Sequence, residues 1–308
     1  MKADKKKPFH ELVAEKLIAQ LRAGTAPWQR PWESGRRSTF PMNPTTGKRY
    51  RGINAIYLMM QGREDSRWMT YKQAAGINAQ VRKSEKGTPI QYWKFTEERD
   101  KEDDAGNVVL DAEGKPVRIT VRLEKPKVFT AYVFNAEQID GLEPLPPLPA
   151  CLWDALERAE SILRSSGAVL EHVAGNRACY RPMADLITLP RREQFLSADR
   201  YYATALHELA HWTGHESRLN RPILFPFGSV EYAKEELRAE ITSLMLGEEL
   251  QIGHDPEQHA AYVGSWIKVV QDDPFEVFRA AADAEKIQEY LLGFERELTW
   301  ESEEEMEV

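Results

Sequence analysis

The chain has 308 residues, 42% of them hydrophobic and 29% charged, a composition typical of a folded protein and not of a disordered or fibrous one. No run of 18 apolar residues occurs, which excludes a membrane-spanning helix, and the N-terminus lacks the unbroken apolar stretch of a secretory signal. Two cysteines, Cys151 and Cys179, are too few for a disulfide scaffold or a four-cysteine zinc site, so we expect a cytoplasmic protein without a membrane partner.

The net charge of −8 conceals a contrast between the two halves of the chain. Residues 1–145 carry 26 Lys and Arg against 19 Asp and Glu, whereas residues 146–308 carry 15 against 30. Within the first 96 residues the excess of basic side chains reaches 12. This contrast indicates that the first half meets a polyanion and that the second half has another task.

A proline-rich linker at 144–150 divides the chain, because proline removes amide donors and favours extended backbone. We therefore predict an α+β protein of two domains, an α+β domain at 1–143 and a domain of a small sheet plus helices at 151–300. Each domain is long enough to bury a core of its own. The acidic tail at 301–308 is expected to be disordered.

Hydrophobic spacing predicts the elements of the first half in chain order. The expected elements are a helix at 9–23 ended by Gly24, short helices at 54–62 and 71–78, and strands at 89–95, 117–123 and 128–134. The acidic stretch at about 97–117 carries two turn signals, which indicate an inserted hairpin or a loop.

In the second half, hydrophobic spacing predicts a helix, then a small sheet and then further helices. We expect a helix at 152–167, three short strands at 168–173, 178–182 and 186–190, and helices from Ser197 onward, including one at 230–252.

The most informative motif is His207-Glu208-Leu209-Ala210-His211. Histidines four apart on a helix project from one face and can bind one zinc ion. Glu208 follows the first histidine, where it can act as the general base of an H-E-x-x-H metallopeptidase. The rival interpretation is an ordinary helix with two surface histidines, but the apolar residues around the motif favour a buried site.

A catalytic zinc site needs a third protein ligand. The longer metzincin pattern matches through Gly214 but fails at Ser217, where a histidine would be required. His215 lies one turn beyond His211, and Gly214 is expected to end the helix before it.

The helix at 230–252 offers Glu236 and Glu240, four apart on one face. This segment resembles thermolysin-like zincins, in which a glutamate from a following helix binds the metal and a residue one turn later holds a ligand histidine. The resemblance makes Glu236 the ligand and Glu240 the partner of a histidine; the reversed roles are the main alternative. Glu235 is interpreted as part of a solvated acidic face.

Four longer blocks of the sequence can be compared with known families: MNPTTGKRYRGINAIYL and RWMTYKQAAGINAQVRKSEKGTPI in the first half, and HELAHWTGHESRLNR and YAKEELRAEITSLML in the second. The first two resemble the N-terminal single-stranded-DNA-binding domain of ArdC-type antirestriction proteins, and the last two resemble the zincin-like metallopeptidase domain of that family. The resemblance spans about residues 9–295. It implies single-stranded DNA binding by the first half, protection of incoming DNA from host restriction, and a place on conjugative plasmids.

The residues themselves also indicate a nucleic-acid partner. Proteins that bind single strands pair cations for the phosphates with aromatic rings for the bases. At least half of Trp28, Trp32, Trp68 and Trp93 must be structural, because a domain of this size needs aromatic core residues. The candidate DNA-binding residues are Trp28, Arg49, Tyr50, Arg51, Asn54, Trp68, Tyr71, Lys72, Lys83 and Lys86.

We thus predict a hydrolase with one divalent ion, zinc in the first place and manganese or another divalent ion as the alternative. Glu208 is the base, and Tyr232 or His215 is a candidate donor to the oxyanion. Partners are single-stranded DNA and either a protein substrate or a host restriction enzyme. In one alternative the metal domain is catalytically silent and DNA coating alone protects; in the other the protein inhibits the restriction enzyme directly.

Overall fold

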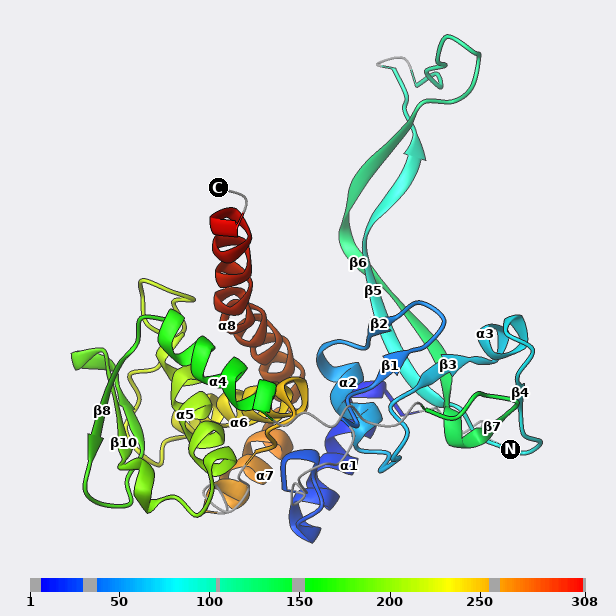
Figure 1. Ribbon diagram of the computed structural model, residues 1–308. Helices are drawn as coiled ribbons and strands as arrows, with labels where there is room; N and C mark the ends of the chain where they lie inside the picture. Colours follow the sequence, from blue (N-terminus) through cyan, green and yellow to red (C-terminus); the bar gives the residue numbers. More distant parts are fainter. Residues whose placement is uncertain (1–6, 30–37, 104–105, 146–152, 255–260, 307–308) are drawn as a thin grey trace.

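The computed structural model describes residues 7–29, 38–103, 106–145, 153–254 and 261–306. The first half contains α1 (Phe9–Ala23), β1 (Met42–Asn43), β2 (Lys48–Arg49), α2 (Gly52–Met59), β3 (Trp68–Thr70), α3 (Tyr71–Gly76), β4 (Gln80–Val81), β5 (Thr88–Asp100), β6 (Arg118–Asn135) and β7 (Ile139–Asp140). The second half contains α4 (Trp153–Ser165), β8 (Val169–Val173), β9 (Cys179–Arg181), β10 (Leu186–Pro190), α5 (Ala198–Trp212), α6 (Val230–Leu250), α7 (Val263–Asp272) and α8 (Glu276–Met306). The predicted α+β class is confirmed (Figure 1).

Local signals in the sequence account for most element boundaries. Helix α1 ends at Gly24, whose φ of 68° lies in the left-handed region that glycine adopts without strain. The strands predicted at 117–123 and 128–134 are one continuous strand, β6, and the described residues of the acidic stretch, 97–103 and 106–117, form the outer end of its hairpin with β5. Of the predicted linker, residues 146–150 lie outside the described residues.

Helix α8 extends to Met306 and so includes residues 301–306 of the acidic tail. Glutamate is a good helix former, so a run of acidic residues can extend a helix that has already been nucleated. Val308 and its neighbour at 307 lie outside the described residues.

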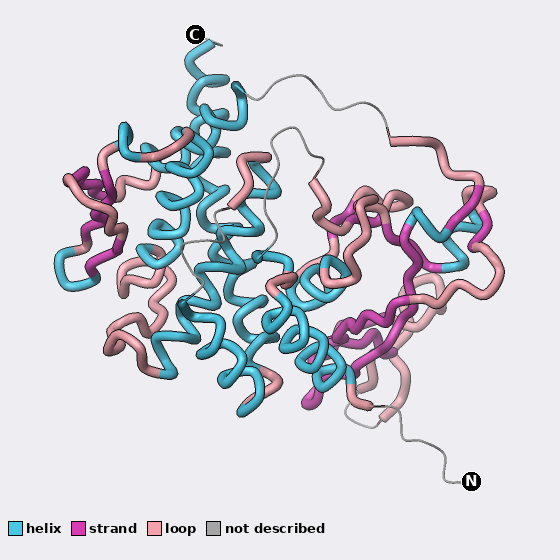
Figure 2. Tube along the Cα trace, turned by 90° about the horizontal axis from the view of Figure 1, so that it is seen from below, coloured by secondary structure: helices cyan, strands magenta, loops and turns pink. Residues whose placement is uncertain are grey.

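The two three-stranded sheets lie at opposite ends of the molecule, with helices between them (Figure 2). Strands β1 and β2, and β4 and β7, form two further sheets of two strands each. In the first half β6 pairs antiparallel with both β3 and β5, and the β5–β6 hairpin extends well beyond the body of the protein (Figure 1). In the second half β10 lies between β8, which is parallel to it, and β9, which is antiparallel. Strand β9 is therefore an edge strand.

The expectation that each half buries its own core is only partly right. One cluster of buried side chains joins Leu17 of α1 and Ile56 of α2 to Leu237 of α6 and Trp266 of α7. A second cluster belongs to the second half alone and backs α5. Helices α1 and α2 thus pack on α6, α7 and α8, and the two halves share a hydrophobic core.

Polar contacts reinforce this junction. Arg51 forms an ion pair of 2.9 Å with Glu285 of α8, and the Thr39 amide donates to Glu248 of α6 at 2.8 Å. The Nε2 of His254 lies 2.8 Å from the carbonyl oxygen of Trp28, to which it donates. Residues far apart in sequence therefore hold the same interface.

The shared core leads to a prediction for unfolding. Leu17 and Leu237 are fully buried in the same cluster, so Leu17→Ala should destabilise the whole protein by about 2–5 kcal/mol. Unfolding in urea should remain a single transition by circular dichroism and by tryptophan fluorescence. Leu196→Ala is the matched control, since Leu196 is 86% exposed and its truncation should change stability by less than about 0.5 kcal/mol. Separate transitions for the two halves would contradict a shared core.

The His254 contact predicts a pH dependence. Burial lowers the pKa of His254 to about 4, against the opposing effect of its bond to the Trp28 carbonyl. Between pH 6.5 and 4, His254 is therefore protonated in the unfolded chain but neutral in the folded protein. As the pH falls through this window, protonation favours the unfolded chain and the free energy of unfolding decreases by about 2–3 kcal/mol. His254→Gln should show a flatter profile of unfolding free energy over this window, measured by urea titration. Identical profiles for the two proteins would refute the prediction.

Candidate metal centre

Helix α5 directs His207 and His211 from one face toward α6. The two ring centroids lie 5.0 Å apart, as expected for side chains four residues apart on a helix. Leu206 and Leu209 pack in the hydrophobic cluster of the second half and hold the helix in place. His207 is 4% exposed, and 12% of the His211 side chain is exposed.

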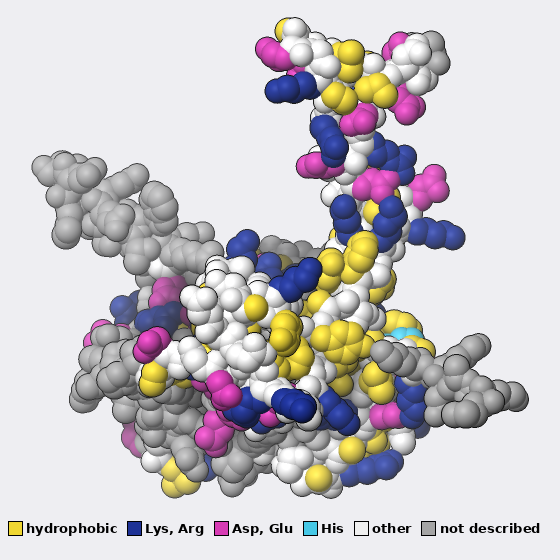
Figure 3. All heavy atoms as spheres, turned by 90° about the vertical axis from the view of Figure 1, so that its right-hand side faces the viewer, with side chains coloured by type: hydrophobic (Ala, Val, Ile, Leu, Met, Phe, Trp, Pro, Cys, Tyr) yellow, Lys and Arg dark blue, Asp and Glu magenta, His cyan; other side chains and the backbone are white. Residues whose placement is uncertain are grey.

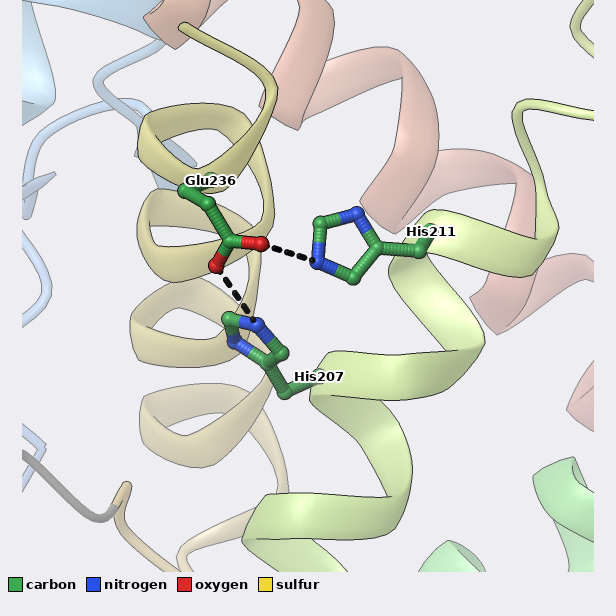
Figure 4. Close-up of side chains that lie close together, drawn as sticks. All are labelled: His207, His211 and Glu236. Carbon is green, nitrogen blue, oxygen red and sulfur yellow. Dashed lines mark ion pairs between the residues drawn. The ribbon is translucent and has the colours of Figure 1, made fainter. Parts of the chain in front are cut away.

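Glu236 of α6 faces both imidazoles (Figure 4). Its Oε2 lies 3.6 Å from Nε2 of His207, and its Oε1 lies 3.5 Å from Nε2 of His211. One ligand atom from each of the three residues lies within 4.8 Å of the others. Two imidazoles and one carboxylate form the donor set of a catalytic zinc site that keeps one position open. The residues present therefore fit a divalent ion.

A second layer of carboxylates orients the histidines. Glu240 Oε2 lies 3.6 Å from Nδ1 of His207, the place that the predicted histidine partner would occupy. Glu235 Oε1 lies 3.2 Å from Nδ1 of His211 and 2.7 Å from Arg221. The interpretation of Glu235 as a solvated residue is wrong: it is 6% exposed, because α6 turns this face toward α5. Such partners fix the orientation of ligand imidazoles.

These buried charges shift one another's pKa values. Burial disfavours charged His211, but Glu236, Glu235 and Glu208 outweigh it and raise the pKa of His211 to about 9. Burial also disfavours charged Glu236, yet the two histidines lower its pKa to about 2. The centre thus holds its carboxylate ionised, which is the form that binds a cation.

Glu208 lies beside the histidines, 7% exposed. Its Oε2 accepts a hydrogen bond of 2.7 Å from the backbone amide of Tyr180 in the edge strand β9. Burial raises the pKa of Glu208, although the nearby histidines oppose that shift. A carboxylate of raised pKa, held by one oxygen, is suited to accept and return a proton.

The centre opens into a cleft of about 730 Å³ between β9 and α6. Tyr232 and Tyr262 line this cleft with their hydroxyl oxygens 3.3 Å apart, and Tyr232 also hydrogen-bonds Glu236. His215 instead lines a different hollow, with its Nδ1 2.8 Å from the hydroxyl of Ser217. Of the two candidate oxyanion donors, the structure brings only Tyr232 to the centre, and it places His215 away from the ligand position.

Three residues that contribute to this site were not predicted from the sequence: Tyr180, Arg221 and Tyr262. The contribution of Tyr180 to Glu208 is a backbone amide, which no side-chain pattern can reveal. Arg221 stands at the end of the block that carries the motif, but its contact with Glu235 depends on the loop after α5 folding back. Tyr262 is the N-cap residue of α7 and lies thirty residues after Tyr232 in the sequence, so no local pattern connects the two.

Two of the predicted DNA-binding aromatics are core residues. Trp28 is 1% exposed and packs edge-on against Trp266, at 6.3 Å between ring centroids. Trp68 is 2% exposed, and its carbonyl accepts a hydrogen bond from Tyr50. Their assignment to base stacking is therefore corrected, because a buried ring offers no face to a base. Burial of Tyr50 raises its pKa to about 12; Trp32 lies outside the described residues.

The polar candidates divide in the same way. Arg49 pairs with Glu249, and Arg51 pairs with Glu285, so both arginines serve the junction between the halves. The Asn54 side chain accepts from the Gln91 amide at 3.0 Å and donates to the Gln91 carbonyl, which anchors β5. Arg49 and Arg51 are exposed too, but their charges are engaged in these ion pairs; the exposed candidates outside the junction are Tyr71, Lys72, Lys83 and Lys86.

Metal content tests the centre directly. Wild-type protein should hold one divalent ion per chain, and His207→Ala should lose it because one of three ligands is gone. His215→Ala is the matched control and should retain the ion, since His215 lies outside the centre. Elemental analysis after gel filtration measures both. Equal metal content in wild type and His207→Ala would refute the assignment.

Comparisons with known proteins agree with this geometry. A family of zincin-like metallopeptidases matches residues 157–283, and the N-terminal domain of the anti-restriction factor ArdC matches residues 7–132. The chain is 70% identical, over 94% of its length, to a protein of Escherichia coli named DNA primase TraC, of which it spans only 20%.

Two crystal structures of antirestriction protein ArdC from the R388 plasmid share the fold. The metal-free structure has a TM-score of 0.73 and 34% identity, and the Mn(II)-bound structure has 0.72 and 33%. Both comparisons cover 94% of this chain and 98% of the other. The chain therefore belongs to the ArdC family of antirestriction proteins, with an ArdC-type N-terminal domain followed by a zincin-like metallopeptidase domain that contains a divalent-metal site.

Proposed function

We propose that this protein protects incoming DNA in the cytoplasm by binding single strands through its first half, and that its metal centre hydrolyses peptide bonds. The observation that carries the peptidase proposal is the buried group of His207, His211 and Glu236 beside Glu208, at the floor of a cleft. A structural metal site would usually be closed by four protein ligands, whereas this group offers three.

The chain's own residues account for the proton transfers. A bound divalent ion, zinc in this proposal, polarises a carbonyl group and makes water more acidic. Glu208 takes a proton from the attacking water and later delivers it to the leaving amine. The amide of Tyr180 holds one oxygen of Glu208 in place. The hydroxyl of Tyr232 lines the same cleft, and in this proposal it turns from Glu236 to donate to the developing oxyanion.

The cleft suits an extended peptide. Strand β9 is an edge strand and forms one wall, so a substrate can lie alongside it as an added strand. The other wall includes Ile223, Phe225 and Phe227, so an apolar side chain of the substrate would be bound there.

The DNA-binding proposal rests on the ArdC-type first half and its exposed basic residues. Tyr71 is 51% exposed, and Lys72, Lys83 and Lys86 are exposed as well. A relative named as a DNA primase contains a segment 70% identical to this chain, which is consistent with a task on DNA. Coating a strand needs affinity alone, so we assign protection to DNA binding and regard peptide hydrolysis as separable from it.

Glu208→Gln separates the two activities. The amide oxygen can still accept from Tyr180, but the base is lost, so hydrolysis of an unfolded protein such as casein should fall by about 100-fold or more. Metal content, single-strand affinity and protection during conjugation into a restricting host should be retained. Glu216→Gln, at an exposed position in the same block, is the control.

Joint replacement of Lys72, Lys83 and Lys86 by glutamine should have the opposite effect: weaker DNA binding, no protection and intact hydrolysis. Lys268→Gln with Lys286→Gln is the matched control, because both lysines are exposed and lie in the second half. Loss of protection in Glu208→Gln with normal DNA binding would instead make the peptidase the effector.

A further inference from the structure

The β5–β6 hairpin forms an arm that leaves the body of the protein (Figure 1). Its root is fixed, because Ile90 and Val133 are buried in a cluster with Trp68 and Asn54 binds the backbone of Gln91. Beyond this root its side chains are largely exposed. Such a long exposed hairpin gains little stability from packing on its own body, so its surface requires another explanation.

Aromatic rings and lysines occupy successive rungs on one face of this arm. Tyr92 pairs with Phe129 across the strands, and the two rings are stacked at 5.2 Å with 13° between their planes. Tyr92 remains 53% exposed and Phe129 40% exposed. The next rung on the same face pairs Lys94 with Lys127, and like charges directly opposite one another are unfavourable unless anions bind beside them. Lys127 also contacts Glu97 at 2.5 Å, but the Lys127 side chain stays 55% exposed, so water weakens this ion pair and the lysine can exchange it for a phosphate.

Charge divides the arm into two parts. The near part, residues 88–96 and 125–135, contains three lysines and no acidic residue. The far part, residues 97–124, contains nine acidic and five basic residues. Figure 3 shows hydrophobic side chains gathered on the lower arm, with basic side chains above them and mixed charges toward the tip. An anionic ligand would therefore be attracted to the near part and not to the tip.

The near part also adjoins the basic surface of the first half. A Cβ on Gly87 would lie 3.0 Å from side-chain atoms of Tyr132 and Phe134, so the loop that carries Lys83 and Lys86 lies against the root of the arm. A hollow of about 810 Å³ beside it is lined by Tyr71, Lys83 and Phe134 among others. The exposed candidates of the first half and the arm thus form neighbouring surfaces.

We infer that the near part of the arm binds single-stranded DNA, with bases stacked on Tyr92 and Phe129 and phosphates neutralised by Lys94 and Lys127. This inference rests on the proposed function and gives it a site. Single-strand binders combine these two kinds of contact, rings for the bases and cations for the backbone. A double helix does not present its base faces, so the ring contacts are specific for a single strand.

The test uses the full-length protein and a fluorescent oligothymidylate, with binding measured by anisotropy over a range of salt concentrations. Tyr92→Ala with Phe129→Ala should weaken binding by about tenfold or more at unchanged salt dependence, because stacking is removed and the cations stay. Lys94→Gln with Lys127→Gln should make the slope of log affinity against log salt shallower by about 1.4, which is about 0.7 for each phosphate that is no longer neutralised. Duplex affinity should not respond to the ring variant.

The far part of the arm supplies the matched control. Leu110 is 56% exposed and Lys115 is also exposed, so Leu110→Ala with Lys115→Gln changes the same classes of side chain outside the proposed site. This variant should bind like wild type. Circular dichroism and metal content, unchanged in all variants, verify that the body is folded.

The outcomes separate this inference from the proposed function. If wild type binds oligothymidylate and the ring and lysine variants bind equally well, the arm is not the site, although DNA binding stands. If wild type does not bind, the proposed function fails and the inference fails with it. If the ring variant changes the sedimentation coefficient of the protein and not its DNA affinity, the arm is a protein interface and the inference is overturned.

Discussion

The packing of α6 on two sides is the constraint on which the rest of the structure depends. One side presents Glu235, Glu236 and Glu240 to the histidines of α5. Another side places Leu237 and Ile241 in the core shared with α1, α2 and α7. Because one rigid helix serves both, the third ligand of the metal centre is positioned by the same packing that joins the two halves.

Burying the charged groups of the metal centre is unfavourable, and a bound cation would offset this cost. Several carboxylates are buried around two imidazoles, and each would be unfavourable alone in a low-dielectric interior. The pKa shifts of His211 and Glu236 show how the groups stabilise each other's charged forms when no ion is bound. A divalent cation supplies that compensation instead, and then the histidines bind it in their neutral form.

The basic residues behind the charge contrast between the halves have two different surroundings. Part of it is internal, since Arg49 and Arg51 of the basic half pair with Glu249 and Glu285 of the acidic half. Another part faces solvent, on the loop with Lys83 and on the near part of the arm. Charge counts alone cannot distinguish these uses, because an arginine in an interface and one on a free surface contribute equally to the sum.

Local patterns in the sequence predicted most of the helices, the metal motif and the order of an α+β first half followed by a small sheet with helices. The spacing of His207 and His211 is sufficient to predict that both imidazoles can bind one ion, because helix geometry puts residues four apart on one face. The choice of Glu236 at the centre depended on how α6 lies against α5, as did the burial of Glu235. Only the tertiary structure decided that Trp28 and Trp68 are core residues and that the halves share a core, because burial is set by contacts between segments distant in the chain.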